Sequence, residues 1–148
     1  MNRALIAVVI VVIAIAVVAS FLVVGGIITA TRRIHGQGAI KAVGVEVYED
    51  PALTVPLTEV NWGIVEPGQE KNHTAYFKNE SNVPITLFLS TDNWSPANAS
   101  NFIALAWDYN GQPLGVDEFV KVTFTLTVDP AISGILDFSF DILVVGSG

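Results

Sequence analysis

The sequence contains no cysteine, one methionine and two histidines among its 148 residues. Without cysteine, the chain can form no disulfide, no thiolate nucleophile and no cysteine-ligated zinc or electron-transfer site. A blue-copper site also requires a cysteine and is excluded. Neither His35 nor His73 belongs to a His-Glu-x-x-His zinc motif or to a recognisable nucleophile motif. We therefore expect no catalytic residue, no metal and no cofactor, and we expect both histidines to be solvated.

Positive charge is also scarce, since seven Lys and Arg residues accompany 14 Asp and Glu residues. The imbalance lies after residue 37, where four lysines accompany all 14 carboxylates and the net charge is −10. A domain with this charge repels nucleic acid and anionic lipid headgroups, so we expect no nucleic-acid partner. The acidic residues match no calcium-loop spacing. We interpret them as turn-forming and solubilising groups, with a calcium site as the less favoured alternative.

Charged residues are absent from Ala4 to Ala30, a run of 27 residues whose only polar side chains are Ser20 and Thr29. As a helix, this run would extend about 40 Å, which exceeds the roughly 30 Å hydrocarbon core of a bilayer. The apolar region of a cleavable secretory signal is shorter, about 7 to 15 residues. We therefore predict a hydrophobic helix over residues 1–33, either an uncleaved signal-anchor or a filament-core helix. A cleaved signal and a buried helix of a soluble core are the less favoured alternatives.

The chain after this run shows the alternation of apolar and polar residues that is typical of half-buried β-strands. Residues 34–38 contain two glycines among polar neighbours, and we predict a hinge there. Alternation then predicts seven strands, at residues 39–48, 58–63, 73–78, 84–90, 102–109, 119–129 and 138–145. Turn signals separate them: Glu66-Pro67-Gly68 is typical of a type II turn, and Asn110-Gly111 of a type I′ hairpin.

Seven short strands separated by turns predict an all-β fold for residues 39–148. We expect an antiparallel β-sandwich of immunoglobulin-like type, with a closed barrel as the less favoured alternative. Six aromatic residues at inward positions are expected to fill its core: Trp62, Phe77, Trp107, Phe124, Phe138 and Phe140.

Four Asn-x-Ser/Thr triplets lie within residues 72–100. The nine asparagines and 18 serines and threonines of the chain would give about one such triplet by chance. The excess predicts an extracytoplasmic, glycosylated domain. The alternative is that the triplets reflect turn composition alone, because Asn, Ser and Thr are frequent in turns. The glycosylation candidates are Asn72, Asn79, Asn93 and Asn98.

The run "VEPGQEKNHTAYFKNESNVPITLFLS" resembles a pattern of small surface β-sandwiches, in which a Pro-Gly turn precedes an alternating strand and an Asn-rich turn follows it. Together with "GAIKAVGVEVY", "NWG" and "FSFDI", it resembles the small archaeal secreted or membrane-anchored proteins akin to the TasA and camelysin group. This resemblance implies a subunit of extracellular filaments whose first strand can pair with a neighbouring subunit. An apolar N-terminal helix joined to a β-sandwich is also similar to archaeal pilins, which implies helices bundled in a filament core.

We therefore expect a non-catalytic cell-surface structural protein, a self-assembling, pilus-like filament subunit. It would form homo-oligomers through the N-terminal helix or the first strand, with residues 4–30 in the membrane before or instead of assembly. The alternative is a solitary membrane-anchored adhesion or glycan-binding module, for which Trp94 in "TDNWSPANAS" is the candidate ligand-stacking residue. The other interpretation of Trp94 is a ring that folds back over the end of the sandwich. An enzyme is the least supported class.

Overall fold

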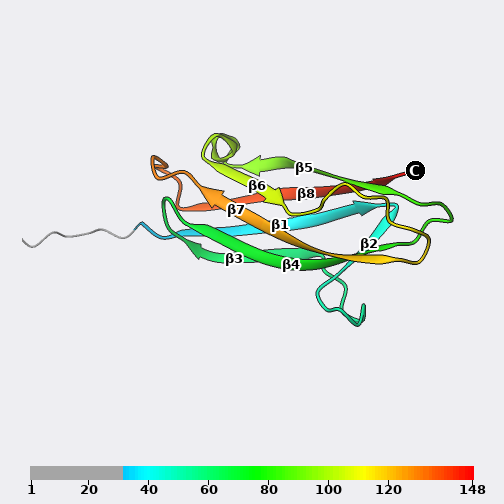
Figure 1. The fold of residues 1–148 in the computed structure, drawn as a ribbon. Coiled ribbons are helices and arrows are strands. Elements are labelled where there is room, and N and C mark those ends of the chain that lie inside the picture. Colours follow the sequence, from blue (N-terminus) through cyan, green and yellow to red (C-terminus); the bar gives the residue numbers. More distant parts are fainter. Residues whose placement is uncertain (1–31) are drawn as a thin grey trace, which may run out of the picture. The chain divides into compact units, whose positions relative to one another are not determined.

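The computed structural model describes residues 32–148, which form a β-sandwich of two four-stranded sheets (Figure 1). This confirms the prediction of an all-β sandwich. A short 3₁₀ helix, η1 (Ala97–Asn101), joins the two sheets between β5 and β6. Sheet A contains, in spatial order, β3 (Glu59–Val65), β1 (Ile34–Val43), β8 (Asp137–Ser147) and β5 (Thr86–Ser95). Sheet B contains β2 (Val45–Tyr48), β4 (Glu70–Asn79), β7 (Phe119–Val128) and β6 (Ile103–Trp107).

The predicted hydrophobic helix over residues 1–33 lies outside the described residues, apart from its last two positions. Arg32 and Arg33 are exposed and are not helical. Within residues 32–148, no helix is both long and apolar enough to span a membrane. Residues from Arg32 onward form one compact unit, so the folded domain begins earlier than the predicted boundary at residue 39.

Residues 34–38, which we predicted to be a hinge, are the first half of strand β1. Ile34, Gly36 and Gly38 are buried and alternate with exposed residues. Position 36 requires glycine because there is no room for a side chain: a Cβ atom there would lie 2.2 Å from Cζ of Phe138. The hinge prediction is therefore wrong. Residues 34–38 belong to a strand, and glycines occupy inward positions at which larger apolar residues are usual.

The first predicted strand, residues 39–48, is divided between the two sheets. β1 ends in sheet A, the backbone turns at Gly44 with a φ of 74°, and β2 continues in sheet B. Glycine adopts this left-handed conformation at little cost. A Cβ atom at Gly44 would also lie 3.1 Å from the carbonyl oxygen of Gly146. The division raises the number of strands from the predicted seven to eight in the described part of the chain.

One strand pair departs from the antiparallel prediction. β1 runs parallel to β8, with His35 opposite Asp137 and Val43 opposite Val145. The pairs β1–β3, β5–β8, β2–β4, β4–β7 and β6–β7 are antiparallel. Alternation along a strand carries no information on the direction of its neighbour, so the sequence could not indicate this exception. Because β1 pairs with β3 on one side and β8 on the other, it lies inside sheet A.

The predicted aromatic core is formed almost as expected. Trp107 is only half-buried, at the border of the core, and stacks on Phe124 with ring centroids 6.2 Å apart. Phe77 meets Phe124 edge to face, with centroids 5.9 Å apart and an interplanar angle of 79°. Burial of large aromatic surfaces stabilises a domain that has no disulfide. The buried members of the set are Trp62, Phe77, Phe124, Phe138 and Phe140.

The two turns predicted by sequence differ in outcome. In the turn from Glu66 to Gln69, the backbone N–H of Gln69 donates to Glu66 O at 3.0 Å, and Gly68 has a φ of 78°, as a type II turn requires. The type I′ prediction for Asn110-Gly111 is corrected, because only the glycine has a positive φ. Oδ1 of Asn110 instead accepts a hydrogen bond from the backbone N–H two residues later. Residues 108–118 therefore form a long connection between β6 and β7.

Candidate functional surfaces

Three of the four glycosylation candidates are exposed, and the elements that carry them reach the end of the sandwich where β1 begins (Figure 1). Asn72 lies near the start of β4, Asn93 near the end of β5, and Asn98 in η1. The backbone N–H of Asp129 donates to Phe102 O at 2.7 Å and ties the segment after η1 to the end of β7. Glycans attached at these three positions would cover this end of the domain.

Asn79, the fourth candidate, is fully buried at the last position of β4. Its Nδ2 donates to the carbonyl oxygens of Val83, Leu114 and Gly115 at 2.8, 3.0 and 3.0 Å. Its Oδ1 accepts hydrogen bonds from the backbone N–H and the hydroxyl of Ser81 at 2.8 and 2.7 Å. A buried and fully bonded amide is not accessible to a glycan-transferring enzyme, so Asn79 is a structural residue of the folded domain.

Trp94 packs onto the core and is not an open platform. The register between β5 and β8 shifts just after Asp92, and Asn93 is left-handed with a φ of 51°. This bulge turns the Trp94 ring onto Phe140, with centroids 4.2 Å apart and planes 8° apart. The indole N–H donates to Thr91 Oγ1 at 3.2 Å. One face of the ring is therefore used within the fold, which favours the folded-back interpretation over ligand stacking.

The two histidines occupy different sheets and different surroundings. His35 is exposed on β1, as predicted. His73 is half-buried: Nε2 lies 3.2 Å from a carboxylate oxygen of Glu49, and the ring meets Trp62 edge to face. The prediction of a solvated side chain is therefore corrected for His73. Within residues 32–148, no three His, Asp or Glu side chains are grouped as metal ligands.

A wide, open groove lies between the end of η1, the first residues of β6 and the adjoining ends of β4 and β7. Two carboxylates line it, those of Glu70 and Asp129. Glu70 accepts a hydrogen bond from the Thr127 hydroxyl at 3.4 Å, and Asp129 accepts one from the backbone N–H of Ala131 at 2.7 Å. These carboxylates are thus engaged with neighbouring groups of the same strands and turn.

The outer face of sheet A carries an apolar patch at the end opposite the start of β1. Val43 of β1 lies opposite Val145 of β8, which in turn lies opposite Phe88 of β5. Their exposed fractions are 63%, 41% and 58%. Leu143, two residues before Val145 on the same strand, is half-buried beside them. We call these four residues the sheet A patch. Adjacent exposed apolar side chains, unlike single ones, indicate a contact surface.

A charged cluster lies next along the same face. Asp141 of β8 accepts hydrogen bonds from Nζ of Lys41 at 2.5 Å and from Nδ2 of Asn93 at 2.6 Å. The Lys41 ammonium group, and after it the Asn93 amide, hold the pKa of Asp141 below its ordinary value. The cluster therefore joins β1, β8 and the bulge of β5 through one ionised carboxylate.

This cluster should make stability depend on pH at the acid end. The pKa of Asp141 is lower in the folded chain than in the unfolded chain, where it is near 3.8. The stabilisation is therefore complete above this value and is lost as pH falls through the folded-state pKa. Melting temperatures measured from about pH 7 to about pH 2 should fall less steeply for Asp141→Asn than for the parent chain. Asp137→Asn, which changes an exposed carboxylate at the start of the same strand, is the matched control, and parallel curves for Asp141→Asn and the parent would contradict the prediction.

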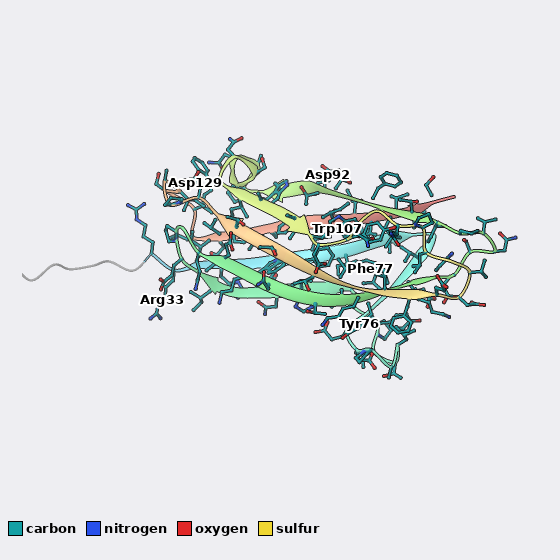
Figure 2. All side chains as sticks on the ribbon, in the orientation of Figure 1. Arg33, Tyr76, Phe77, Asp92, Trp107 and Asp129 are labelled. Carbon is teal, nitrogen blue, oxygen red and sulfur yellow. The ribbon has the colours of Figure 1, made fainter. Side chains whose placement is uncertain are left out.

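The outer face of sheet B carries aromatic rings in place of aliphatic side chains. Tyr48 of β2 lies opposite Tyr76 of β4, and Tyr76 lies beside Phe119 of β7, with centroids 6.5 Å apart and planes at 52°. Phe119 is 49% exposed, and both tyrosines are half-buried. Figure 2 shows Tyr76 pointing away from the sandwich, whereas Phe77, the next residue, points between the sheets. We call Tyr48, Tyr76 and Phe119 the sheet B aromatic face.

This aromatic face was not predicted from the sequence, although the alternation of residues contained the signal. The alternation that sends Ala75 and Phe77 inward sends Tyr76 outward. The same argument sends Phe119 outward, because Val120 and Val122 point inward. What the alternation did not reveal is that β4 and β7 are neighbours, which brings the two outward rings together.

Comparison with known proteins gives no assignment. The sequence matches no model of a known protein family, and no curated protein is significantly similar to it. A function for this chain is therefore inferred from its surfaces and its sequence.

Proposed function

We propose that this protein is a non-catalytic structural protein of the cell surface that self-assembles into extracellular, pilus-like filaments. The observation that carries the proposal is the sheet A patch, an apolar row across three strands of a strongly acidic domain. A second copy of the chain is its proposed partner. The uncharged run from Ala4 to Ala30 supports the same conclusion, because such a segment is buried either by lipid or by copies of itself.

We propose further that the sandwich is of the immunoglobulin-like type. Its first strand is shared between the sheets through Gly44. The connections β3–β4, β4–β5, β5–β6 and β7–β8 each cross from one sheet to the other. Short strands of two packed sheets with repeated crossings between them are typical of this class.

A location outside the cell fits the surface of the domain. Asn72, Asn93 and Asn98 are exposed and remain glycosylation candidates. Residues 38–148 have a net charge of −10, which opposes binding to anionic headgroups and favours a domain held away from the membrane. We propose that residues 4–30 anchor the chain in the membrane before assembly.

Assembly through the apolar run is favoured over assembly through the first strand. β1 is paired with β3 and β8 of its own sandwich. Exchange of this strand with a neighbour would first break these hydrogen bonds, whose loss leaves buried backbone groups unsatisfied. We therefore propose that residues 4–30 and the sheet A patch together form the contacts between subunits.

The variant Phe88→Asp should abolish or strongly reduce filament formation. A carboxylate at this position must lose its hydration when a second copy covers the patch, and the contact also loses the apolar surface of a Phe ring, about 1.5–3 kcal/mol. Electron microscopy of a sheared surface fraction, with peptide identification, should show the parent chain in filaments. The variant should give at least about tenfold fewer.

Phe119→Asp is the matched control, because it alters an exposed Phe of sheet B and should leave the filaments intact. The N-terminus of the purified subunit distinguishes the two routes of assembly: a start within residues 1–5 fits a helix-cored filament, and a start near residue 31 fits strand exchange. Filaments that survive Phe88→Asp would contradict the role of the sheet A patch. A chain that stays in the membrane as a monomer would overturn the filament proposal and favour the solitary adhesion or glycan-binding module.

A further inference from the structure

The outer faces of the two sheets differ in chemistry, and the face of sheet B remains unexplained by a filament contact. The sheet A patch is aliphatic apart from Phe88. On sheet B, the exposed apolar surface comes from the rings of Tyr48, Tyr76 and Phe119, which occupy three neighbouring strands. Aromatic rings that present a face to solvent beside polar groups are suited to stacking against the C–H surface of a sugar ring.

Two of the four lysines of an acidic domain lie on the aromatic face. Lys78 lies opposite both Glu46 and Phe119 in register, and its Nζ forms an ion pair with Glu80 at 2.6 Å. Lys121 lies opposite Tyr76. The carboxylates near them are those of Glu46, Glu80 and Asp117, so the excess of negative charge is much smaller here than in the domain as a whole. A polyanion would be repelled by the domain, and an uncharged ligand would not.

Beyond the rings, the outer face of sheet B carries hydroxyl groups. Thr123, Thr125 and Thr127 share the outward side of β7, and Thr74 of β4 lies opposite Thr123. The Thr125 hydroxyl donates to Oδ1 of Asn72 at 2.9 Å. An apolar protein or lipid partner would have to desolvate this row, which costs free energy for each unpaired hydroxyl. A ligand that is itself rich in hydroxyls would replace those hydrogen bonds.

The strip is also long enough to contact an extended polymer. β4 and β7 each contain ten residues, and at about 3.3 Å per residue the strip extends about 33 Å. The rings lie toward one end of it, beside the start of β7, and the threonines occupy the rest. Several sugar units of one chain could therefore contact the face at once.

From this juxtaposition we propose that the outer face of sheet B binds a neutral polysaccharide. Tyr76 and Phe119 stack against sugar rings, and the hydroxyl of Thr123 exchanges hydrogen bonds with sugar hydroxyls. Tyr48, opposite Tyr76 on the neighbouring strand, forms the edge of the binding face. The binding site does not depend on filament assembly, since the face belongs to a single copy of the domain.

The test is affinity electrophoresis of the full chain, purified in detergent, through native gels that contain one polysaccharide each. The neutral probes are a soluble β-glucan, a mannan and soluble starch, and polygalacturonate is the anionic probe. At least one neutral polysaccharide should retard the parent chain, and polygalacturonate should not. Tyr76→Ala and Phe119→Ala should each weaken the apparent affinity about tenfold, whereas Tyr76→Phe should retain it within about twofold, because the stacking ring is kept.

Phe88→Ala is the matched control, since it removes an exposed Phe from the other sheet and should bind as the parent does. Melting temperatures of all variants identify any that fail to fold. The proposal would be overturned by equal retardation of Tyr76→Ala and the parent, by stronger binding to polygalacturonate, or by no retardation with any of the three neutral probes. Loss of filaments in Phe88→Asp with full polysaccharide binding would separate this site from the assembly surface.

Discussion

Asn79→Ala is expected to lower the free energy of unfolding by about 3–5 kcal/mol. The substitution removes an amide group that donates to three carbonyl oxygens and accepts two hydrogen bonds from Ser81. Each buried polar group left without a partner costs about 1–3 kcal/mol, although the backbone relaxes in part. Since single domains are stable by only about 5–15 kcal/mol, the loss is a large fraction of the total.

The position of Asn79 explains why the loss of one amide should lower the free energy of unfolding by this amount. It links the end of β4 to the turn at Val83 and to the connection at Leu114 and Gly115. Leu114 in turn exchanges two backbone hydrogen bonds with Ile85, the residue before β5, at 2.7 and 3.0 Å. Loss of the amide should therefore loosen both loops at this end of the sandwich together.

Urea unfolding followed by tryptophan fluorescence measures the effect. Asn98→Ala is the matched control, because it removes an exposed asparagine from η1 and should change stability by less than about 0.5 kcal/mol. Asn79→Asp should be at least as harmful as Asn79→Ala, because it buries a charge and removes the donor. Equal stability of the Asn79 and Asn98 variants would refute the structural role, as would a glycan found on Asn79 in the folded protein.

Gly36→Ala is expected to destabilise the domain by about 3 kcal/mol. A Cβ atom at this position would lie 2.2, 2.6 and 2.9 Å from three ring atoms of Phe138. The ring has little freedom to move, because it is buried and stacks on Phe140 with centroids 6.1 Å apart. Relief requires a shift of β1 against β8, which would disturb the parallel pairing along both strands.

The matched control is Gln37→Ala, which changes the adjacent, exposed residue of the same strand and should be nearly neutral. Phe138→Leu combined with Gly36→Ala tests the cause, because a smaller side chain opposite the new methyl group should recover part of the lost stability. Free energies of unfolding of the parent, Gly36→Ala, Phe138→Leu and the double variant give the interaction energy. If Gly36→Ala behaved as Gln37→Ala does, residues 34–38 would not be held as a buried strand, and the hinge prediction would regain support.

The strands show which structural features can be predicted from the local alternation of apolar and polar residues. The alternation in residues 119–129 predicted a strand, and β7 spans Phe119–Val128 with Val122, Phe124 and Leu126 buried. The same alternation, extended two residues beyond Phe77, would have placed Asn79 inside and removed it from the glycosylation candidates. For Trp94 the sequence left two interpretations open, and alternation could not choose between them because a bulge shifts the alternation of β5 by one residue.

The sequence by itself determined the fold class, the inward side of most strands and the core aromatics, because side chains alternate along any single strand. It also determined the acidic character of the domain and the uncharged run at residues 4–30. Only the tertiary structure decided that β1 lies inside sheet A and parallel to β8, and that Tyr76 and Phe119 share a face. The physical reason is that strand pairing joins distant parts of the chain: Lys41 meets Asp141 across 100 residues, and backbone hydrogen bonds between strands do not depend on side-chain identity.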